Sequence, residues 1–154
     1  MPQKVSRSPG RSNIVVAWWM IGIGTGAGAV LGLWSFGGPV PPPAGFALYD
    51  DLPRRLLRLA HIATIALPVL NLLYVPWIER SMWKGRLRAI GCWLLLFGTG
   101  TLPALLAVTA FWRPALYVLP APVLALVITF FLLAVGLPGA GGNGGKEKTP
   151  CGSA

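Results

Sequence analysis

Four apolar stretches of about 22 to 24 residues each take up more than half of this 154-residue chain. An α-helix of about 20 apolar residues is long enough to cross the hydrocarbon core of a bilayer, which is about 30 Å thick. Hydrophobic residues make up 55% of the chain and charged residues only 11%, which leaves too little polar surface for a soluble domain. We therefore predict an all-α integral membrane protein whose four transmembrane helices form an up-down bundle.

The four stretches form one predicted transmembrane domain over residues 14–137. The predicted spans are 14–36, 56–77, 89–112 and 116–137. Residues 1–13 contain Lys and Arg among Ser, Pro and Gly without apolar periodicity, so we predict a disordered basic tail. Residues 138–154 are rich in Gly, and we predict a second disordered tail there. A Pro-rich stretch over residues 37–47 is expected to form an extended connector between the first two spans.

Basic residues are divided unequally between the two sides that four spans would create. The two tails and the turn 78–88 would share one side and hold nine of the 13 Lys and Arg residues. The other side would hold four, Arg54, Arg55, Arg58 and Arg113. The positive-inside rule then predicts cytoplasmic N and C termini, and we expect the bacterial cytoplasmic (inner) membrane. Topology and the lipid bilayer explain the net charge of +9, so we do not expect nucleic acid as a partner.

A cluster of charged residues near the start of the second span is the first candidate site. It comprises Asp50, Asp51, Arg54, Arg58, His61 and, from the turn after the third span, Arg113. Arg54, Arg58 and His61 follow a spacing of four and then three residues, which places them on one stripe of a helix. One interpretation is an ion-paired helix start whose arginines meet lipid phosphate. The other is an outward-facing polar pocket with a binding function.

His61 is the only histidine, and it raises the alternative of a redox protein that binds haem or a quinone. A six-coordinate haem needs a second axial ligand. The only methionine inside a predicted span, Met20, would lie near the opposite membrane face, about 20 Å away at about 1.5 Å per residue. A His/Met pair within one chain is therefore excluded. A five-coordinate haem, a haem shared between two chains, and a quinone hydrogen-bonded by His61 stay open.

The first span is rich in glycine at helical spacing, with Gly22, Gly24, Gly26, Gly28 and Gly32. These form three Gly-x-x-x-Gly pairs, a pattern that lets helix backbones approach closely in membranes. The outline Gly22-x-Gly24-x-x-Ala27 resembles a dinucleotide loop, but that motif requires a preceding strand. Helix packing is the favoured interpretation.

Asn71 lies inside the apolar part of the second span, where water cannot satisfy its amide. We expect a structural hydrogen bond to Thr99 of the third span or to the backbone of the first. A contact with a transported substrate is the alternative.

Residues for catalysis are scarce. No Asp or Glu falls inside a predicted span, and the sequence contains no metal-ligand cluster, Gly-x-Ser-x-Gly elbow or Walker loop. We therefore predict neither catalytic nor metal-binding residues, and not an enzyme. The first functional hypothesis is a non-catalytic accessory or assembly subunit that packs against a larger membrane protein or a second copy of itself. A haem- or quinone-binding redox protein is the second, and a small-solute pore or carrier the third.

Overall fold

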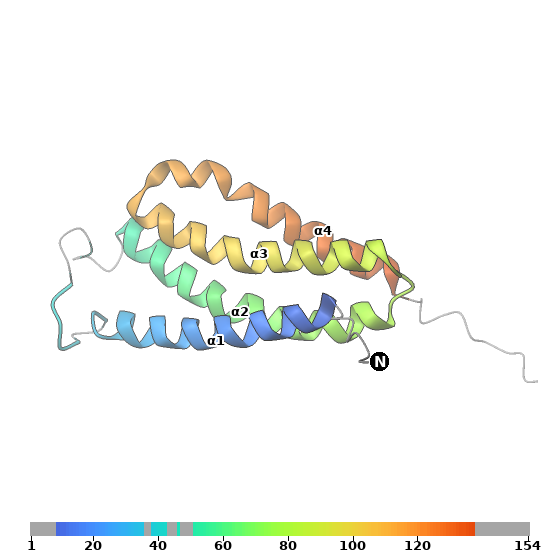
Figure 1. The fold of residues 1–154 in the computed structure, drawn as a ribbon. Coiled ribbons are helices and arrows are strands. Elements are labelled where there is room, and N and C mark those ends of the chain that lie inside the picture. The colour runs from blue at the N-terminus through green and yellow to red at the C-terminus, as the bar shows by residue number, and fades with distance from the viewer. Residues whose placement is uncertain (1–8, 36–37, 43–45, 47–50, 138–154) are drawn as a thin grey trace, which may run out of the picture.

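The computed structural model describes residues 9–35, 38–42, 46 and 51–137. It contains four long helices, α1 (Pro9–Gly32), α2 (Leu52–Arg80), α3 (Arg86–Phe111) and α4 (Pro120–Gly136), with a short 3-10 helix, η1 (Arg113–Val118), between α3 and α4 (Figure 1). The described part of the chain has no strand. Four segments are long and apolar enough to cross a membrane, namely Gly10–Gly32, Leu52–Arg80, Arg86–Phe111 and Arg113–Gly136. The prediction of an all-helical chain with four such segments is confirmed.

The helix ends differ from the predicted spans, and two of the differences change which element a residue belongs to. Helix α1 begins at Pro9, so residues 9–13, which the sequence analysis assigns to the basic tail, belong to the helix. Proline suits a first helical turn, where its missing N–H costs no hydrogen bond. The fourth segment is not one α-helix, because the 3-10 turns of η1 precede α4 and Pro120 starts the new helix. Residues 1–8 and the predicted C-terminal tail, 138–154, lie outside the described residues.

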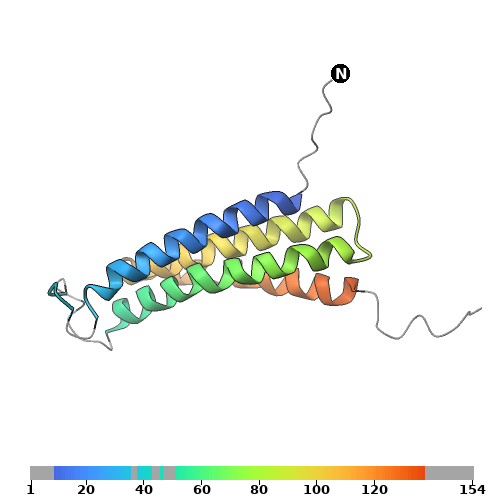
Figure 2. The same ribbon diagram turned by 90° about the horizontal axis from the view of Figure 1, so that it is seen from below.

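The helices pack mainly on their neighbours in the sequence. Helix α2 packs against both α1 and α3, α3 also packs against α4, and α1 makes a smaller contact with α3. Helix α4 touches α2 only slightly, and these elements show no contact between α4 and α1. Figure 2 shows the four helices lying side by side along one direction. Helix α1 therefore has one packed side and one side that the described chain leaves uncovered.

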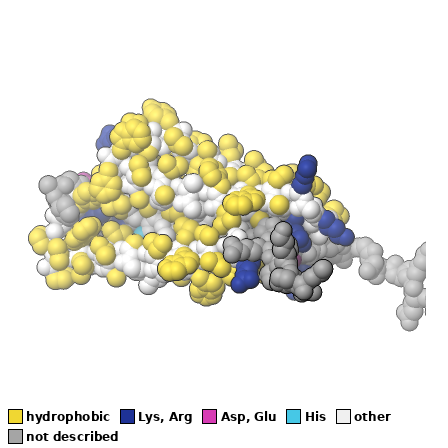
Figure 3. All heavy atoms as spheres, viewed as in Figure 1, with side chains coloured by type: hydrophobic (Ala, Val, Ile, Leu, Met, Phe, Trp, Pro, Cys, Tyr) yellow, Lys and Arg dark blue, Asp and Glu magenta, His cyan; other side chains and the backbone are white. Residues whose placement is uncertain are grey.

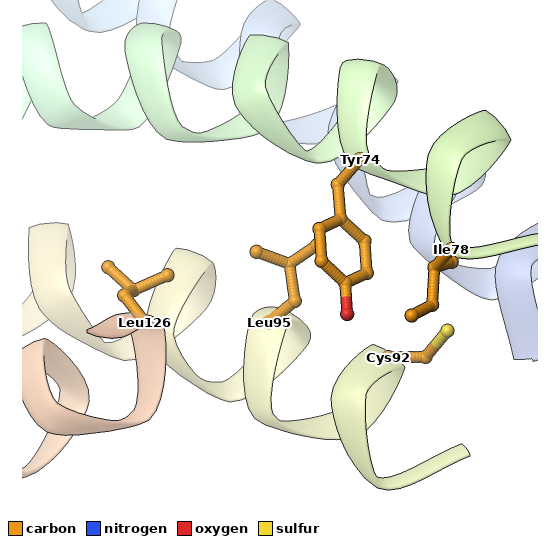
Figure 4. Close-up of a cluster of buried hydrophobic side chains, with 5 residues drawn as sticks. All are labelled: Tyr74, Ile78, Cys92, Leu95 and Leu126. Atoms are coloured by element: carbon orange, nitrogen blue, oxygen red, sulfur yellow. The ribbon is translucent and has the colours of Figure 1, made fainter. Parts of the chain in front are cut away.

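The buried core lies where α2, α3 and α4 meet. Its cluster consists of Tyr74, Ile78, Cys92, Leu95 and Leu126. Figure 4 shows the Tyr74 ring reaching from α2 toward α3, between the side chains of Leu95 and Cys92.

Outside this core, large apolar side chains cover much of the surface, and Lys and Arg gather toward the two ends of the molecule (Figure 3). That distribution is typical of a protein whose middle is surrounded by lipid.

Candidate functional site

Two of the five glycines in the first predicted span, 14–36, lie in the interface between α1 and α2. A Cβ atom placed on Gly24 would lie 2.7 Å from Cγ1 of Ile65, and one placed on Gly28 would lie 2.5 Å from Cε1 of His61. Both distances are shorter than carbon atoms in contact can tolerate. Gly24 and Gly28 therefore let side chains of α2 rest directly on the backbone of α1, as small residues do in membrane helix pairs.

The other three glycines of that predicted span have open space beside them. A Cβ atom on Gly22, Gly26 or Gly32 would meet nothing within 4 Å. Gly22 lies in a shallow groove of about 630 Å³ that Ile14, Val15, Trp18, Trp19 and Ile23 also line. Trp18 and Trp19 are 62% and 72% exposed. We call Ile14, Val15, Trp18, Trp19, Gly22, Ile23 and Gly26 the open face of α1.

His61 points at α1. From the Cβ position of Gly28, the ring atoms Cε1, Nε2 and Nδ1 lie at 2.5, 2.9 and 3.3 Å, so the ring edge that carries both nitrogens faces the helix. Nδ1 is buried and has no hydrogen-bond partner among the described residues. Haem iron binds through a ring nitrogen, so a haem at His61 would require α1 to move away. The described residues contain no group of three or more His, Cys, Asp or Glu side chains that could hold a metal ion.

Arg54 fastens the end of α1 and the connector to the start of α2. Its Nη2 donates to the carbonyl oxygen of Trp34 at 2.6 Å, and its Nη1 donates to that of Phe46 at 3.4 Å. A cation beside carbonyls that follow a helix C-terminus also interacts favourably with the helix dipole.

Arg58 lines the same small cavity as Arg54, together with Leu31, Trp34, Ser35, Pro42, Phe46 and Leu57. The volume of this cavity is about 20 Å³, which is room for a water molecule but not for a larger solute.

The residues of the predicted charged cluster therefore do not form one site in the structure. Arg113 begins η1 and lines a different cavity, of about 240 Å³, with Leu52, Pro53, Leu56, Thr109, Ala110 and Leu116. Asp51 directly precedes α2, and Asp50 lies outside the described residues. Of the six predicted residues, Arg54 and Arg58 share a cavity, His61 faces Gly28, and Arg113 lines its own pocket.

Replacing Arg54 with methionine is expected to lower the free energy of unfolding by about 1 to 2 kcal/mol, because the carbonyls of Trp34 and Phe46 lose their charged donor. The connector between α1 and α2 should then be cleaved faster by added proteinase K. Arg55→Met is the matched control, since Arg55 is the exposed neighbour. Equal cleavage rates in the two variants would contradict the anchoring role of Arg54.

The interior of the bundle holds several polar side chains, among them Asn71 and Thr99, the predicted hydrogen-bond pair. Asn71 is fully buried, but neither atom of its amide has a hydrogen-bond partner, and the hydroxyl of Thr99 has none either. The expected direct hydrogen bond from Asn71 to another helix is therefore not formed.

Asn13 makes an interhelical bond instead. Its Nδ2 donates to the carbonyl oxygen of Cys92 at 3.2 Å, from a fully buried position on α1. Asn13 falls in the predicted basic tail, 1–13, and is not among the predicted site residues. Its position directly before an apolar run was the available signal.

Two features of the described chain thus stand out, the open face of α1 and a polar interior between α2 and α3. The proposed function is based on these two features. Comparison of the chain with protein-family models, with curated proteins and with solved structures finds no match.

Proposed function

We propose that this chain is a non-catalytic accessory or assembly subunit that docks on a larger membrane protein through the open face of α1. The observation that carries the proposal is the pair Gly22 and Gly26, both exposed and both with open space beside them. Glycine costs about 1 kcal/mol relative to alanine inside a helix. A glycine that faces lipid brings no packing benefit to offset this cost. A glycine that faces a second helix lets the two backbones approach closely.

The exposed tryptophans also support docking through the open face of α1. Trp18 and Trp19 sit beside Gly22 in the groove, and large aromatic side chains are enriched at protein interfaces. A partner helix resting on Gly22 and Gly26 would be flanked by these rings. The partner would be another apolar transmembrane helix, because this face carries no charge.

Filling the glycine pair is expected to remove the partner without unfolding the chain. In the double variant Gly22→Leu, Gly26→Leu, the new side chains enter open space, so the melting temperature in mild detergent should stay close to that of the natural sequence. The amount of partner that co-purifies should fall strongly. Gly32→Leu is the matched control, since it is also an open glycine of α1 but lies outside the groove.

Either of two results would overturn the docking proposal. One is that the natural chain, extracted from the membrane in mild detergent, has the mass of a single copy and carries no partner. The other is a double variant that retains its partner as well as the control does. A partner that proves to be a second copy of the chain would place the same face in a homo-oligomer.

The proposed placement is an up-down bundle in the bacterial cytoplasmic membrane with both termini inside. The unequal distribution of Lys and Arg, nine against four, supports it. We expect Lys84→Cys to react with an impermeant thiol reagent only from the inside, and Val40→Cys only from the outside. Cys92 is buried, and replacing Cys151 with serine removes the remaining background. Labelling of both positions from the same side would contradict this placement.

The redox alternative ranks second because of the orientation of His61. Both ring nitrogens face α1, so a haem or a quinone at His61 would have to enter between two packed helices. The pore or carrier alternative ranks third.

A further inference from the structure

The interface between α2 and α3 brings together two buried polar side chains whose hydrogen-bonding groups are unused. Asn71 and Thr99 are both fully buried, and the amide nitrogen, amide oxygen and hydroxyl have no partner. Thr99 is unusual among the described threonines. Each of the other five, Thr25, Thr64, Thr101, Thr109 and Thr129, donates its hydroxyl to the carbonyl four residues earlier. The hydroxyl of Thr99 is therefore available for another partner.

Two contacts fix the register of α2 against α3. The Tyr74 hydroxyl lies beside Gly91, 2.6 Å from where a Cβ atom would be, and Leu56 lines the same pocket as Ala110. Counting from either pair, Asn71 is level with residue 94 or 95 of α3, four or five residues from Thr99. Side chains of a helix lean toward its N-terminus, so in these antiparallel helices the side chains of Asn71 and Thr99 lean toward each other.

Asn71 and Thr99 are not bonded to each other, because none of their side-chain polar atoms has a partner. Two successive hydrogen bonds of about 2.8 Å each join atoms up to about 5.6 Å apart, so one bridging water molecule reaches further than a direct hydrogen bond does. Polar groups held apart at such a distance are commonly joined by water.

A proline adds a further acceptor at the same place. Pro103 lies inside α3 and has no backbone N–H, so the carbonyl of Thr99, four residues earlier, loses its usual helical donor. The location thus offers the Asn71 amide, the Thr99 hydroxyl and the Thr99 carbonyl. Buried water typically makes about three hydrogen bonds to such groups.

We propose that Asn71 and Thr99 form an internal binding site for water between α2 and α3. Unpaired polar groups are unfavourable in the membrane interior, and water both donates and accepts hydrogen bonds as these groups require. A sodium ion would bring a full positive charge into the membrane interior, where a nearby carboxylate would be needed to neutralise it. The nearest one along α2, on Glu79, is eight residues from Asn71, about 12 Å at 1.5 Å per residue.

The test uses the side-chain amide of Asn71 as a reporter in the full chain. The chain has three asparagines, Asn13, Asn71 and Asn143, so labelling asparagine with ¹⁵N gives few side-chain signals, and Asn71→Gln identifies the one from Asn71. In lipid nanodiscs we expect magnetisation transfer from water to the Asn71 amide. Thr99→Val should abolish or strongly weaken this transfer. Thr129→Val should preserve it, because the buried hydroxyl of Thr129 already has a carbonyl partner.

Three results would overturn the proposal. The first is an Asn71 amide of the natural chain that receives no magnetisation from water. The second is transfer that Thr99→Val leaves unchanged. The third is an Asn71 signal that shifts when sodium chloride replaces choline chloride, which would identify a cation at the site. The first and third results are measured on the natural chain, so they test the proposal even if a variant fails to fold.

Discussion

Replacing Gly28 with leucine is expected to separate α1 from α2 and to lower the free energy of unfolding by about 3 kcal/mol, at the upper end of overpacking effects. A single added Cβ atom would already lie 2.5 Å from the His61 ring, and leucine adds three further carbons. Reversible unfolding in mixed micelles, followed by circular dichroism or by steric trapping, would measure the loss.

The neighbouring glycine supplies the control for this prediction. Gly26 lies two residues before Gly28, about 200° around the helix, and has open space beside it. Gly26→Leu should leave the unfolding free energy unchanged or slightly raised, because glycine is the poorer helix former. His61→Ala should in turn relieve part of the damage caused by Gly28→Ala, giving a non-additive double mutant. Equal effects of leucine at positions 26 and 28 would show that α1 packs on α2 differently.

The helical character of the chain was predictable because lipid leaves the backbone few choices. Each apolar stretch must satisfy its N–H and C=O groups internally, and within one segment only a helix does so. The start of α1 was not predictable from hydropathy. Gly10 lies among polar residues in the sequence, but a Cβ atom at Gly10 would lie 3.0 Å from Val75 Cγ1. The first turn of α1 therefore rests on the far end of α2, a tertiary contact that no local pattern encodes.

The glycine pattern predicted close packing but not its direction. Because two residues turn a helix by about 200°, the pairs Gly22/Gly26 and Gly24/Gly28 had to face nearly opposite sides. Which pair meets α2 depends on the side chains that α2 presents, here His61 and Ile65. The fate of Asn71 was unpredictable for a similar reason, since its distance from Thr99 follows from the register of two helices joined by a short turn.

Replacing Trp83 with alanine is expected to release the end of α4 from the α2–α3 turn and to cost about 3 kcal/mol. The estimate is at the lower end for tryptophan truncation because the side chain is only half-buried. Trp83 Nε1 donates to the carbonyl oxygen of Leu132 at 2.7 Å, and the Met82 N–H donates to that of Gly136 at 2.9 Å. The indole ring also occupies the space where a Cβ atom of Gly136 would be. The turn thus holds the last turn of α4 through three contacts.

Two further variants separate the ring from its hydrogen bond. Trp83→Phe keeps most of the ring but leaves the Leu132 carbonyl without this donor, so it should cost about 1 kcal/mol. Gly136→Ala should displace the ring and approach the effect of Trp83→Ala. Trp93→Ala is the matched control, since Trp93 is 67% exposed and its truncation should change the unfolding free energy little. If Trp83→Ala and Trp93→Ala prove equally stable, the turn does not hold α4, and the hydrophobic contacts between α3 and α4 alone must position that helix.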